Sequence, residues 1–365
     1  MKIIVSIISE QTIPNYLFIK EMFHSGDKLM FISSKKMSNR IEWIENALGW
    51  NLLDPQHVVF KKAGDEEDWS SMTSQIEKNL SKNDEYIVNL TGGTKYMALA
   101  VQSVFSRHKS QFFYIPYPQN QILSAESEAR PVTHRVSVDE YTQLYNQPLR
   151  SAHEPLMPKA YTEKFFKAFI KGWDRETWET IDRLREYRNL KKSLPITAIA
   201  NADNGKLSRV VGLNAFLTRI SFEHDGTLSG QQAQYLTGGW FEEFVYHRIK
   251  ELLRPQDIML GAKTTSTNND LDVVFTLGNK LYVIECKTGV EGGRMLNEII
   301  YKASALKENL LGLSARSYIF SLGQDNEMWT QAAGNMGITY YGRSTFVDDN
   351  LFQDIVNAIR KTSYD

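Results

Sequence analysis

Over its first 146 residues the chain alternates short β-rich segments with segments whose apolar residues recur at helical spacing. We predict five strands here, separated by helical segments, at residues 3–8, 29–33, 57–61, 86–90 and 112–115. Such alternation is typical of a parallel sheet covered by helices on both faces. Residues 119–141 break the rhythm, and we expect them to add an antiparallel extension at one edge of the sheet. The predicted fold class is therefore α/β.

The rest of the chain differs in pattern. A chain of 365 residues is too long for one ordinary core, so two or three domains are expected. Residues 146–160 contain three prolines and little periodicity, and we interpret them as a linker. Residues 158–230 look mostly helical. Residues 158–220 contain 13 Lys and Arg but only 7 Asp and Glu. This basic bias fits solvated helix faces and a nucleic-acid surface equally well. From residue 231 the order is helix, strand hairpin, helix, strand. We predict three parts: 1–146, a connecting region 147–230, and 231–365.

Composition narrows the class of protein. The formal net charge is −1, so any basic surface must be local. No apolar run reaches the roughly 20 residues that a membrane span needs. Cys286 is the single cysteine, which excludes an internal disulfide and a Cys-rich zinc site. We therefore expect a cytoplasmic protein with no membrane partner.

A glycine turn follows the fourth predicted strand, in the stretch NLTGGTKYMA at residues 89–98. Glycines let backbone N–H groups approach a ligand, and the dipole of the following helix favours anions. The stretch matches neither the phosphate-loop nor the dinucleotide-binding glycine pattern, so alone it fits a tight turn as well as an anion cradle. If the strand order is 3-2-1-4-5, this turn faces residues 9–15, SEQTIPN, across the crevice where such sheets bind ligands.

A second informative stretch, residues 269–289, has two β-rich runs on either side of Gly278 and Asn279, which suit a two-residue hairpin turn. In that register, paired residue numbers sum to 557, and Asp272 lies opposite Glu285.

Directly opposed carboxylates have Cβ atoms about 4.5–5.5 Å apart and repel each other, so the pair needs a cation. A hard divalent ion is the natural occupant. Lys287 lies one step along the same face, within reach of an attacking water or a charged phosphate. The alternative is an ordinary exposed hairpin face with mixed charges.

The helix expected at residues 238–253 offers a third carboxylate. Its apolar stripe places Glu242 at the stripe's edge, where it can lean toward the hairpin, and places Glu243 in solvent. Glu242 could equally be a boundary residue with no role. Cys286 should point into the core, which argues against a nucleophilic role.

The glycine turn and the SEQTIPN loop together resemble the CARF ligand-sensing domain of type III CRISPR accessory proteins, over roughly residues 1–146. The resemblance implies a Rossmann-like fold and a homodimer that binds a cyclic oligoadenylate across its two-fold axis. The residues that it implies for the ring site are Gln11, Ser33, Ser34, Thr91, Gly92, Gly93, Thr94 and Lys95.

The pattern Asp…Glu-x-Lys on a hairpin, preceded by a helix with a Glu, resembles the PD-(D/E)XK nuclease superfamily over about residues 231–365. The proline of the family's name is absent before Asp272. The resemblance implies catalytic roles for Glu242, Asp272, Glu285 and Lys287. It also implies that the three carboxylates, with the backbone carbonyl of Cys286, hold Mg²⁺ or Mn²⁺.

The whole chain resembles the CARF–nuclease effectors of type III CRISPR immunity. That resemblance implies a cyclic tetra-adenylate-activated, metal-dependent nuclease acting on single-stranded DNA and/or RNA. Two alternatives stay open. One is a nucleotide sensor whose C-terminal domain recruits a partner without cleavage, and the other is a nicking nuclease of duplex DNA.

Overall fold

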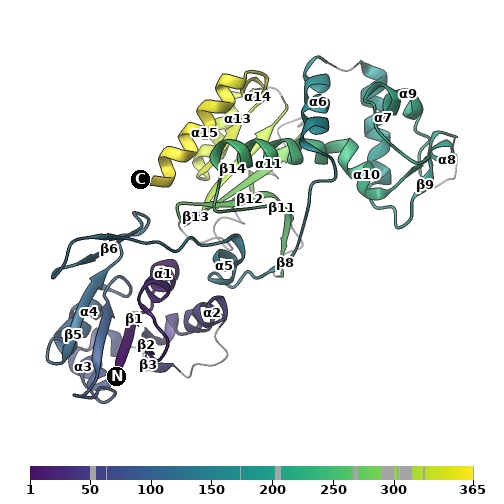
Figure 1. Cartoon of the computed structure of the whole chain (residues 1–365). Coiled ribbons are helices and arrows are strands. Elements are labelled where there is room, and N and C mark those ends of the chain that lie inside the picture. Colours follow the sequence, from purple (N-terminus) through teal and green to yellow (C-terminus); the bar gives the residue numbers. More distant parts are fainter. Residues whose placement is uncertain are drawn as a thin grey trace.

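The computed structural model describes residues 1–49, 55–62, 64–172, 174–201, 207–265, 270–288, 300–301, 304, 315–323 and 325–364. Its described part forms a seven-stranded sheet, a mainly helical region and a six-stranded sheet (Figure 1). The fold is mixed α/β, as the sequence predicts.

The N-terminal sheet has the strand order β3-β2-β1-β4-β5-β6-β7. Strands β1 to β5 are parallel, and β6 and β7 continue the sheet in antiparallel pairs beyond β5. Both the 3-2-1-4-5 order and the antiparallel extension are therefore confirmed. The strands are β1 (Lys2–Ile7), β2 (Lys28–Ser34), β3 (Gln56–Phe60), β4 (Glu85–Asn89), β5 (Lys109–Tyr114), β6 (Gln121–Ser124) and β7 (Arg130–Pro131).

Helices cover both faces of this sheet because its strands are apolar on both sides. On β1, Ile4 packs into the core shared with α1 and α2, whereas Val5 and Ile7 pack into the core shared with α3 and α4. The helices are α1 (Ile13–Met22), η1 (Lys35–Met37), α2 (Asn39–Leu48), η2 (Asp65–Glu67), α3 (Trp69–Glu77), α4 (Lys95–Phe105) and α5 (Val138–Gln143).

The connecting region is mostly helical, as predicted, with one short antiparallel pair of strands. Aromatic side chains of α6 pack on α11, where the rings of Phe166 and Phe244 stack with centroids 3.9 Å apart. The elements are α6 (Lys159–Ile170), α7 (Arg175–Leu184), η3 (Arg185–Tyr187), β9 (Leu194–Pro195), α8 (Ile196–Asn201), α9 (Leu213–Arg219), β10 (Thr227–Leu228), α10 (Gly230–Gln234) and the π-helix η4 (Tyr235–Gly239).

The C-terminal sheet has the order β15-β14-β13-β12-β11-β8, antiparallel from β8 to β13 and parallel from β13 to β15. The elements are α11 (Trp240–Leu253), β11 (Asp257–Thr264), β12 (Asp270–Leu277), β13 (Lys280–Lys287), β14 (Arg316–Ser321), α13 (Glu327–Asn335), β15 (Ile338–Tyr341), α14 (Ser344–Val347) and α15 (Asp349–Tyr364).

One part of the predicted linker is a strand, so the linker interpretation is wrong there. Residues Leu149–His153 form β8, the edge strand that pairs with β11. Most side chains of β8 are exposed, so the segment carries no apolar alternation from which a strand could be predicted.

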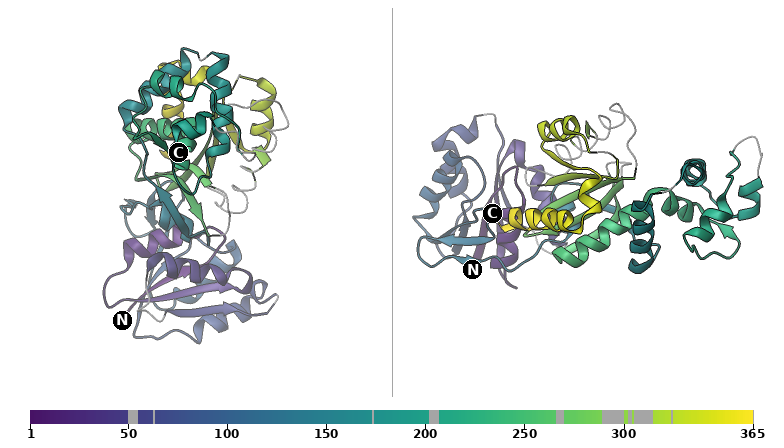
Figure 2. Two further views of the ribbon diagram at one scale, coloured as in Figure 1. Left: turned by 90° about the vertical axis from the view of Figure 1, so that its right-hand side faces the viewer. Right: turned by 90° about the horizontal axis from the view of Figure 1, so that it is seen from above.

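The C-terminal sheet lies between the other two parts of the chain, with the N-terminal sheet on one side and α7 to α9 on the other (Figures 1 and 2). Its two faces belong to different cores. Val273 and Phe275 pack with α11 and α15, whereas Val274 and Leu281 share a core with α1, α2 and α5. The sheet is therefore in direct apolar contact with the N-terminal domain. None of the described helices is long and apolar enough to cross a membrane.

Candidate functional site

The β12–β13 hairpin turns at Gly278 and Asn279, as predicted. Both residues have positive φ, 60° and 61°, which is typical of a type I′ hairpin turn. The strand pairs run from Leu277–Lys280 to Val273–Ile284, and every pair sums to 557. The predicted register is therefore confirmed, and Asp272 follows the last of these pairs.

A compact cluster of charges occupies the open end of the hairpin. The Nζ atom of Lys287 is 2.7 Å from Oε1 of Glu285 and 3.6 Å from Oδ2 of Asp272. Lys287 also donates to the backbone carbonyl of Cys286 at 3.1 Å, and Oδ2 of Asp272 accepts the N–H of Cys286 at 2.7 Å. The structure thus brings together the residues that the hairpin register predicts.

Burial and mutual repulsion shift the pKa values in this cluster. Burial raises the pKa of Asp272 well above its usual range, and repulsion from Glu285 and Glu242 adds to the shift. Burial alone would lower the pKa of Lys287, but Asp272 and Glu285 outweigh it and raise that pKa. Burial raises the pKa of the Cys286 thiol, which keeps it neutral and unsuited to nucleophilic attack.

Helix α11 supplies the third carboxylate from its first turn. Glu242 is half-buried, and burial raises its pKa to about 7, with Lys287 opposing the shift and Glu285 adding to it. Glu242 is therefore close enough to the hairpin for its pKa to respond to the charges of Lys287 and Glu285.

The expectation that Glu243 lies in solvent is wrong. Glu243 is buried, and its carboxylate accepts the backbone N–H groups of Leu156 (2.6 Å) and Met157 (3.2 Å). The prediction for Glu243 took the sheet to be the only part of the chain that covers α11. The segment that leads into α6 also packs on this helix, and a single-helix pattern cannot show that long-range contact.

Arg188, in the connecting region, reaches the same end of the hairpin. It is not among the site residues predicted from the sequence. Its Nε donates to Oγ1 of Thr237 at 2.6 Å, and its Nη2 donates to the carbonyl of Thr237 at 2.7 Å. A Cβ added to Gly238 would lie 3.3 Å from Nη2 of Arg188 and 3.7 Å from Oγ1 of Thr288. Burial lowers the pKa of the guanidinium, and Glu242 opposes that shift. The basic bias of residues 158–220 was the only feature of the sequence that could have indicated a role for Arg188.

The donor set suits a hard divalent ion in its chemistry. Carboxylate and carbonyl oxygens are the ligands that Mg²⁺ and Mn²⁺ prefer. A cation would relieve the repulsion between Asp272 and the neighbouring carboxylates, which adds to the effect of burial on the pKa of Asp272. As it stands, Lys287 bridges Asp272 and Glu285. Within the described ranges, no three His, Cys, Asp or Glu residues form a group that could hold a metal ion. Ion binding by Glu242, Asp272 and Glu285 together would therefore require these carboxylates to move closer to one another.

The glycine turn packs closely on the end of β1. A Cβ on Gly92 would lie 1.8 Å from the carbonyl O of Ile7, and a Cβ on Gly93, where φ is +73°, would lie 2.6 Å from Cγ2 of Ile7. Thr94 then caps α4 by accepting the N–H of Met97 at 3.1 Å. Contact with β1 therefore explains both glycines without a ligand.

A buried amide network fixes this turn to its neighbours. Asn15 donates to the carbonyl of Ile7 (3.0 Å), and Asn89 donates to Oδ1 of Asn15 (3.0 Å). Oδ1 of Asn89 accepts the backbone N–H of Thr91 at 3.0 Å, and Oγ1 of Thr91 accepts the N–H of Ile115 at 2.8 Å. The ends of β1, β4 and β5 and the start of α1 therefore form one hydrogen-bonded unit.

The ring-site candidates differ in accessibility. Gly93, Thr94 and Lys95 are exposed, and Gln11 and Thr91 are half-buried. Gly92, Ser33 and Ser34 are buried, and the hydroxyl of Ser33 donates to the carbonyl of Ser34. The structure thus offers an accessible edge from the turn and the 9–15 loop, with the serines beneath the surface.

Comparison with known families identifies both ends of the chain. The Card1 CARF domain matches residues 3–141, and the endonuclease domain described as Card1-like matches residues 230–357. This chain combines a Card1-type CARF domain with a Card1-like endonuclease domain. The glycine turn lies in the first matched range and the Asp272–Lys287 hairpin in the second, while Arg188 lies between them. No curated protein matches the chain.

Solved structures share the fold of this chain over most of its length. Can2 from Sulfobacillus thermosulfidooxidans, in complex with cyclic tetra-adenylate, has a TM-score of 0.71 at 19% identity and covers 98% of this chain and 100% of its own. Protein VC1899 from Vibrio cholerae has a TM-score of 0.73 at 18% identity, covering 99% and 98%. A type III CRISPR defence DNA nuclease activated by cyclic oligoadenylate has a TM-score of 0.54 at 15% identity, covering 88% of this chain and 46% of its own.

Proposed function

We propose that this protein is a nuclease of type III CRISPR defence, activated by cyclic tetra-adenylate and dependent on a divalent metal, that cleaves single-stranded DNA and/or RNA. The observation that carries the proposal is the Asp272–Glu285–Lys287 cluster in the same chain as a CARF domain. A module that only recruits a partner has no need of two buried carboxylates bridged by a lysine. We place the protein in the cytoplasm, in three parts: 1–146, 147–230 with β8 joining the C-terminal sheet, and 231–365.

The catalytic roles follow from the chemistry of the hairpin. Glu242, Asp272, Glu285 and the backbone carbonyl of Cys286 would hold Mn²⁺ or Mg²⁺, which when bound lowers the pKa of water and offsets charge on a phosphate. Lys287 keeps its positive charge because its pKa is raised, so it can donate a hydrogen bond to the attacking water or to a phosphate oxygen.

Arg188 is proposed to bind the substrate backbone. Its guanidinium is fixed on one side by Thr237 and lies beside Gly238, whose other neighbour is Thr288. A fixed guanidinium matches the fork of oxygen atoms on a phosphate better than a lysine does. The connecting region would in this way contribute to the site as well as joining the two domains.

The crevice between the glycine turn and the 9–15 loop is proposed to bind the cyclic oligoadenylate. Lys95 offers an exposed positive charge, Thr94 and Gly93 an open start of α4, and Gln11 and Thr91 polar side chains. Gly92 holds the turn on β1, and Ser33 and Ser34 form the floor. The cyclic tetra-adenylate in the Can2 complex supports this ligand class.

A homodimer is proposed to complete the ring site. Tyr96 and Leu99 of α4 are 42% and 56% exposed, directly after Lys95. Apolar side chains exposed beside a polar binding edge are typical of a surface that a second copy covers. A two-fold axis near α4 would bring two copies of the turn to one ring.

The experiment is cleavage of labelled single-stranded DNA, single-stranded RNA and supercoiled duplex DNA, with Mn²⁺, Mg²⁺ or EDTA, and with or without cyclic tetra-adenylate. We expect cleavage of a single-stranded substrate that needs both the ring and a metal. If duplex DNA is nicked and neither single-stranded substrate is cut, the protein would be the nicking nuclease of the second alternative. Ring binding without cleavage of any substrate would contradict the nuclease and leave the recruiting sensor.

A further inference from the structure

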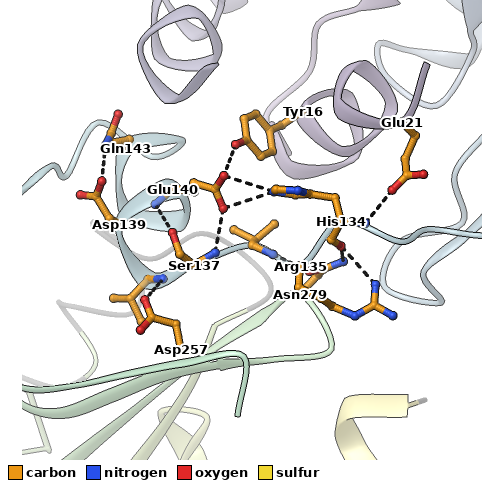
Figure 3. Close-up of polar contacts among 12 residues, drawn as sticks. Tyr16, Glu21, His134, Arg135, Ser137, Asp139, Glu140, Gln143, Asp257 and Asn279 are labelled. Atoms are coloured by element: carbon orange, nitrogen blue, oxygen red, sulfur yellow. Dashed lines mark hydrogen bonds and ion pairs between the residues drawn. The ribbon is translucent and has the colours of Figure 1, made fainter. Parts of the chain in front are cut away.

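The tip of the catalytic hairpin is buried in the N-terminal domain. Asn279 is fully buried, and its side chain makes three hydrogen bonds there. Its Nδ2 donates to Oδ1 of Asn120 at 2.6 Å, and its Oδ1 accepts the N–H of Val136 at 2.9 Å. Nδ2 also donates to the carbonyl of His134 at 3.2 Å (Figure 3). The amide group is thus satisfied on both sides by the CARF domain, through Asn120 and through the segment after β7.

The main chain of the tip is held as well. The carbonyl of Asn279 accepts the hydroxyl of Tyr117 at 2.8 Å, and the carbonyl of Gly278 accepts Nδ2 of Asn120 at 2.9 Å. Asn279 therefore joins the hairpin to the CARF domain by donors and acceptors that a two-residue turn does not itself need. The turn conformation explains a residue with positive φ at this position, but it does not explain the buried side-chain amide.

The same CARF segment is bonded to α1. Oε1 of Glu21 accepts the N–H groups of Thr133 (2.7 Å) and His134 (2.6 Å). Glu140 accepts the hydroxyl of Tyr16 at 2.5 Å and Nε2 of His134 at 3.2 Å (Figure 3). Both ends of α1 thus hold the segment that holds the tip.

Helix α1 begins at the proposed ring site. Its first three residues are the last three of residues 9–15, and Oγ1 of Thr12 donates to the carbonyl of Leu144 at 2.7 Å. Asn15 belongs to the amide network that fixes the glycine turn. A change in the position of α1 would therefore reach the 134–140 segment, and through it Asn279.

A hydrogen bond between α5 and the C-terminal sheet is a second contact between the two domains. The N–H of Val138 donates to Oδ2 of Asp257, on β11, at 2.9 Å (Figure 3). Val274, Leu281 and Val283 of the hairpin share one apolar core with α1 and α5. Close-packed contacts of this kind transmit displacement instead of absorbing it.

We propose that Asn279 is a positioning residue that ties the catalytic hairpin to the sensor domain, so that the state of the ring site sets the position of Asp272 and Glu285. The proposal rests on the proposed function. Glu285 lies six residue steps along β13 from Asn279, about 20 Å at roughly 3.3 Å per residue, and the two strands are paired over that length. A small rotation at the tip therefore moves the carboxylates relative to Glu242, which belongs to α11.

The test compares Asn279→Gly with a matched control, Asn146→Gly. Both asparagines have positive φ, 61° and 58°, so glycine suits both turns, but Asn146 is exposed. Tyr117→Phe removes a single bond to the tip and serves as a milder second variant. Thermal unfolding establishes that each variant folds, and Tyr117→Phe carries the test if Asn279→Gly does not fold.

Two readouts decide the proposal. The first is amide hydrogen exchange at Cys286 and Lys287 without ligand, which we expect to be at least tenfold faster in Asn279→Gly than in wild type and unchanged in Asn146→Gly. The second is the ratio of ring-stimulated to basal cleavage, which we expect to fall at least tenfold while ring affinity stays within about threefold. Unchanged exchange together with an unchanged ratio would overturn the positioning role. If wild type neither binds the ring nor cleaves, the proposed function fails, and the exchange readout alone decides the role of Asn279.

Discussion

Glu242 and Glu243 are neighbours in α11, yet their carboxylates belong to different parts of the domain. Glu242 lies beside the charges of Glu285 and Lys287, whereas Glu243 accepts two backbone N–H groups of the segment that leads into α6. Glu242 is therefore placed for a role in cleavage, whereas Glu243 stabilises the fold.

This difference predicts opposite results for the same substitution. Glu242→Gln should lower cleavage by roughly 100-fold without lowering the melting temperature, because it removes a charge that the site disfavours. Glu243→Gln should cost about 1–3 kcal/mol of folding free energy, because an amide replaces a carboxylate that binds two backbone donors, and it should leave cleavage by the folded protein near normal. Melting curves and cleavage rates at one pH check both. A reversed pattern would contradict the placement of the two side chains.

Arg188→Ala should weaken substrate binding more than turnover. A charge-assisted contact to a phosphate is worth about 1.5–3 kcal/mol, so KM should rise by roughly tenfold or more. The dependence of binding on salt should fall by about one phosphate contact. Arg175→Ala is the control, because Arg175 is exposed and pairs with Glu179 of its own helix. A loss of stability with an unchanged KM would show that Arg188 serves only the bonds to Thr237.

At the ring site, Lys95→Ala should raise the Kd for cyclic tetra-adenylate by about tenfold and leave the melting temperature unchanged, because Lys95 is exposed. Lys109→Ala, an exposed lysine paired with Glu85 on the same domain, should change neither. Gly92→Ala is not a clean probe, because its Cβ meets the carbonyl of Ile7 and should destabilise the domain with or without ligand. Equal ring binding by Lys95→Ala and wild type would show that the ring binds elsewhere.

The stability contributed by Glu140 should depend on pH. Burial alone raises the pKa of Glu140, but hydrogen bonds from His134, Tyr16 and the N–H of Ser137 outweigh it and hold the pKa at about 2. A lowered pKa in the folded state means that the contribution is complete above the unfolded value of 4.5 and is lost as pH falls toward 2. Urea unfolding of wild type and Glu140→Gln should therefore differ by up to about 3 kcal/mol near pH 7 and by less near pH 3.5. A difference that grows toward acid pH would contradict this hydrogen-bond arrangement.

Local patterns in the sequence predicted much of this fold. Alternation of strands and helices predicted the parallel sheet, and its strand order agrees with the common 3-2-1-4-5 arrangement that we assumed. The 557 register follows from Gly278 and Asn279, because a two-residue turn fixes every pair after it. Contacts between distant segments could not be read in the same way. Edge strand β8 lacks apolar alternation, and the burial of Glu243 depends on packing by the segment before α6.

Arg188 and Asn279 show the same limit at the site. Each has an ordinary local interpretation, as a solvated helix residue or a turn residue. Only the assembled domains bring Arg188 to the hairpin and bury the side chain of Asn279. The turn at Gly92 shows the reverse case. Its glycines suggested a ligand cradle, but the end of β1 already explains them, so the evidence for a ring site there comes from the CARF match and from Lys95.

The most direct test of the central claim is cleavage of labelled single-stranded DNA and RNA, with Mn²⁺ and a titration of cyclic tetra-adenylate, by wild type and Asp272→Asn. Asparagine keeps an oxygen that can accept the N–H of Cys286, so the hairpin should stay folded. We expect wild type to cleave only when the ring is added, and Asp272→Asn to bind the ring with the same Kd but to lose cleavage by roughly 100-fold or more. Full ring-dependent cleavage by Asp272→Asn would contradict the assignment of this hairpin as the catalytic element.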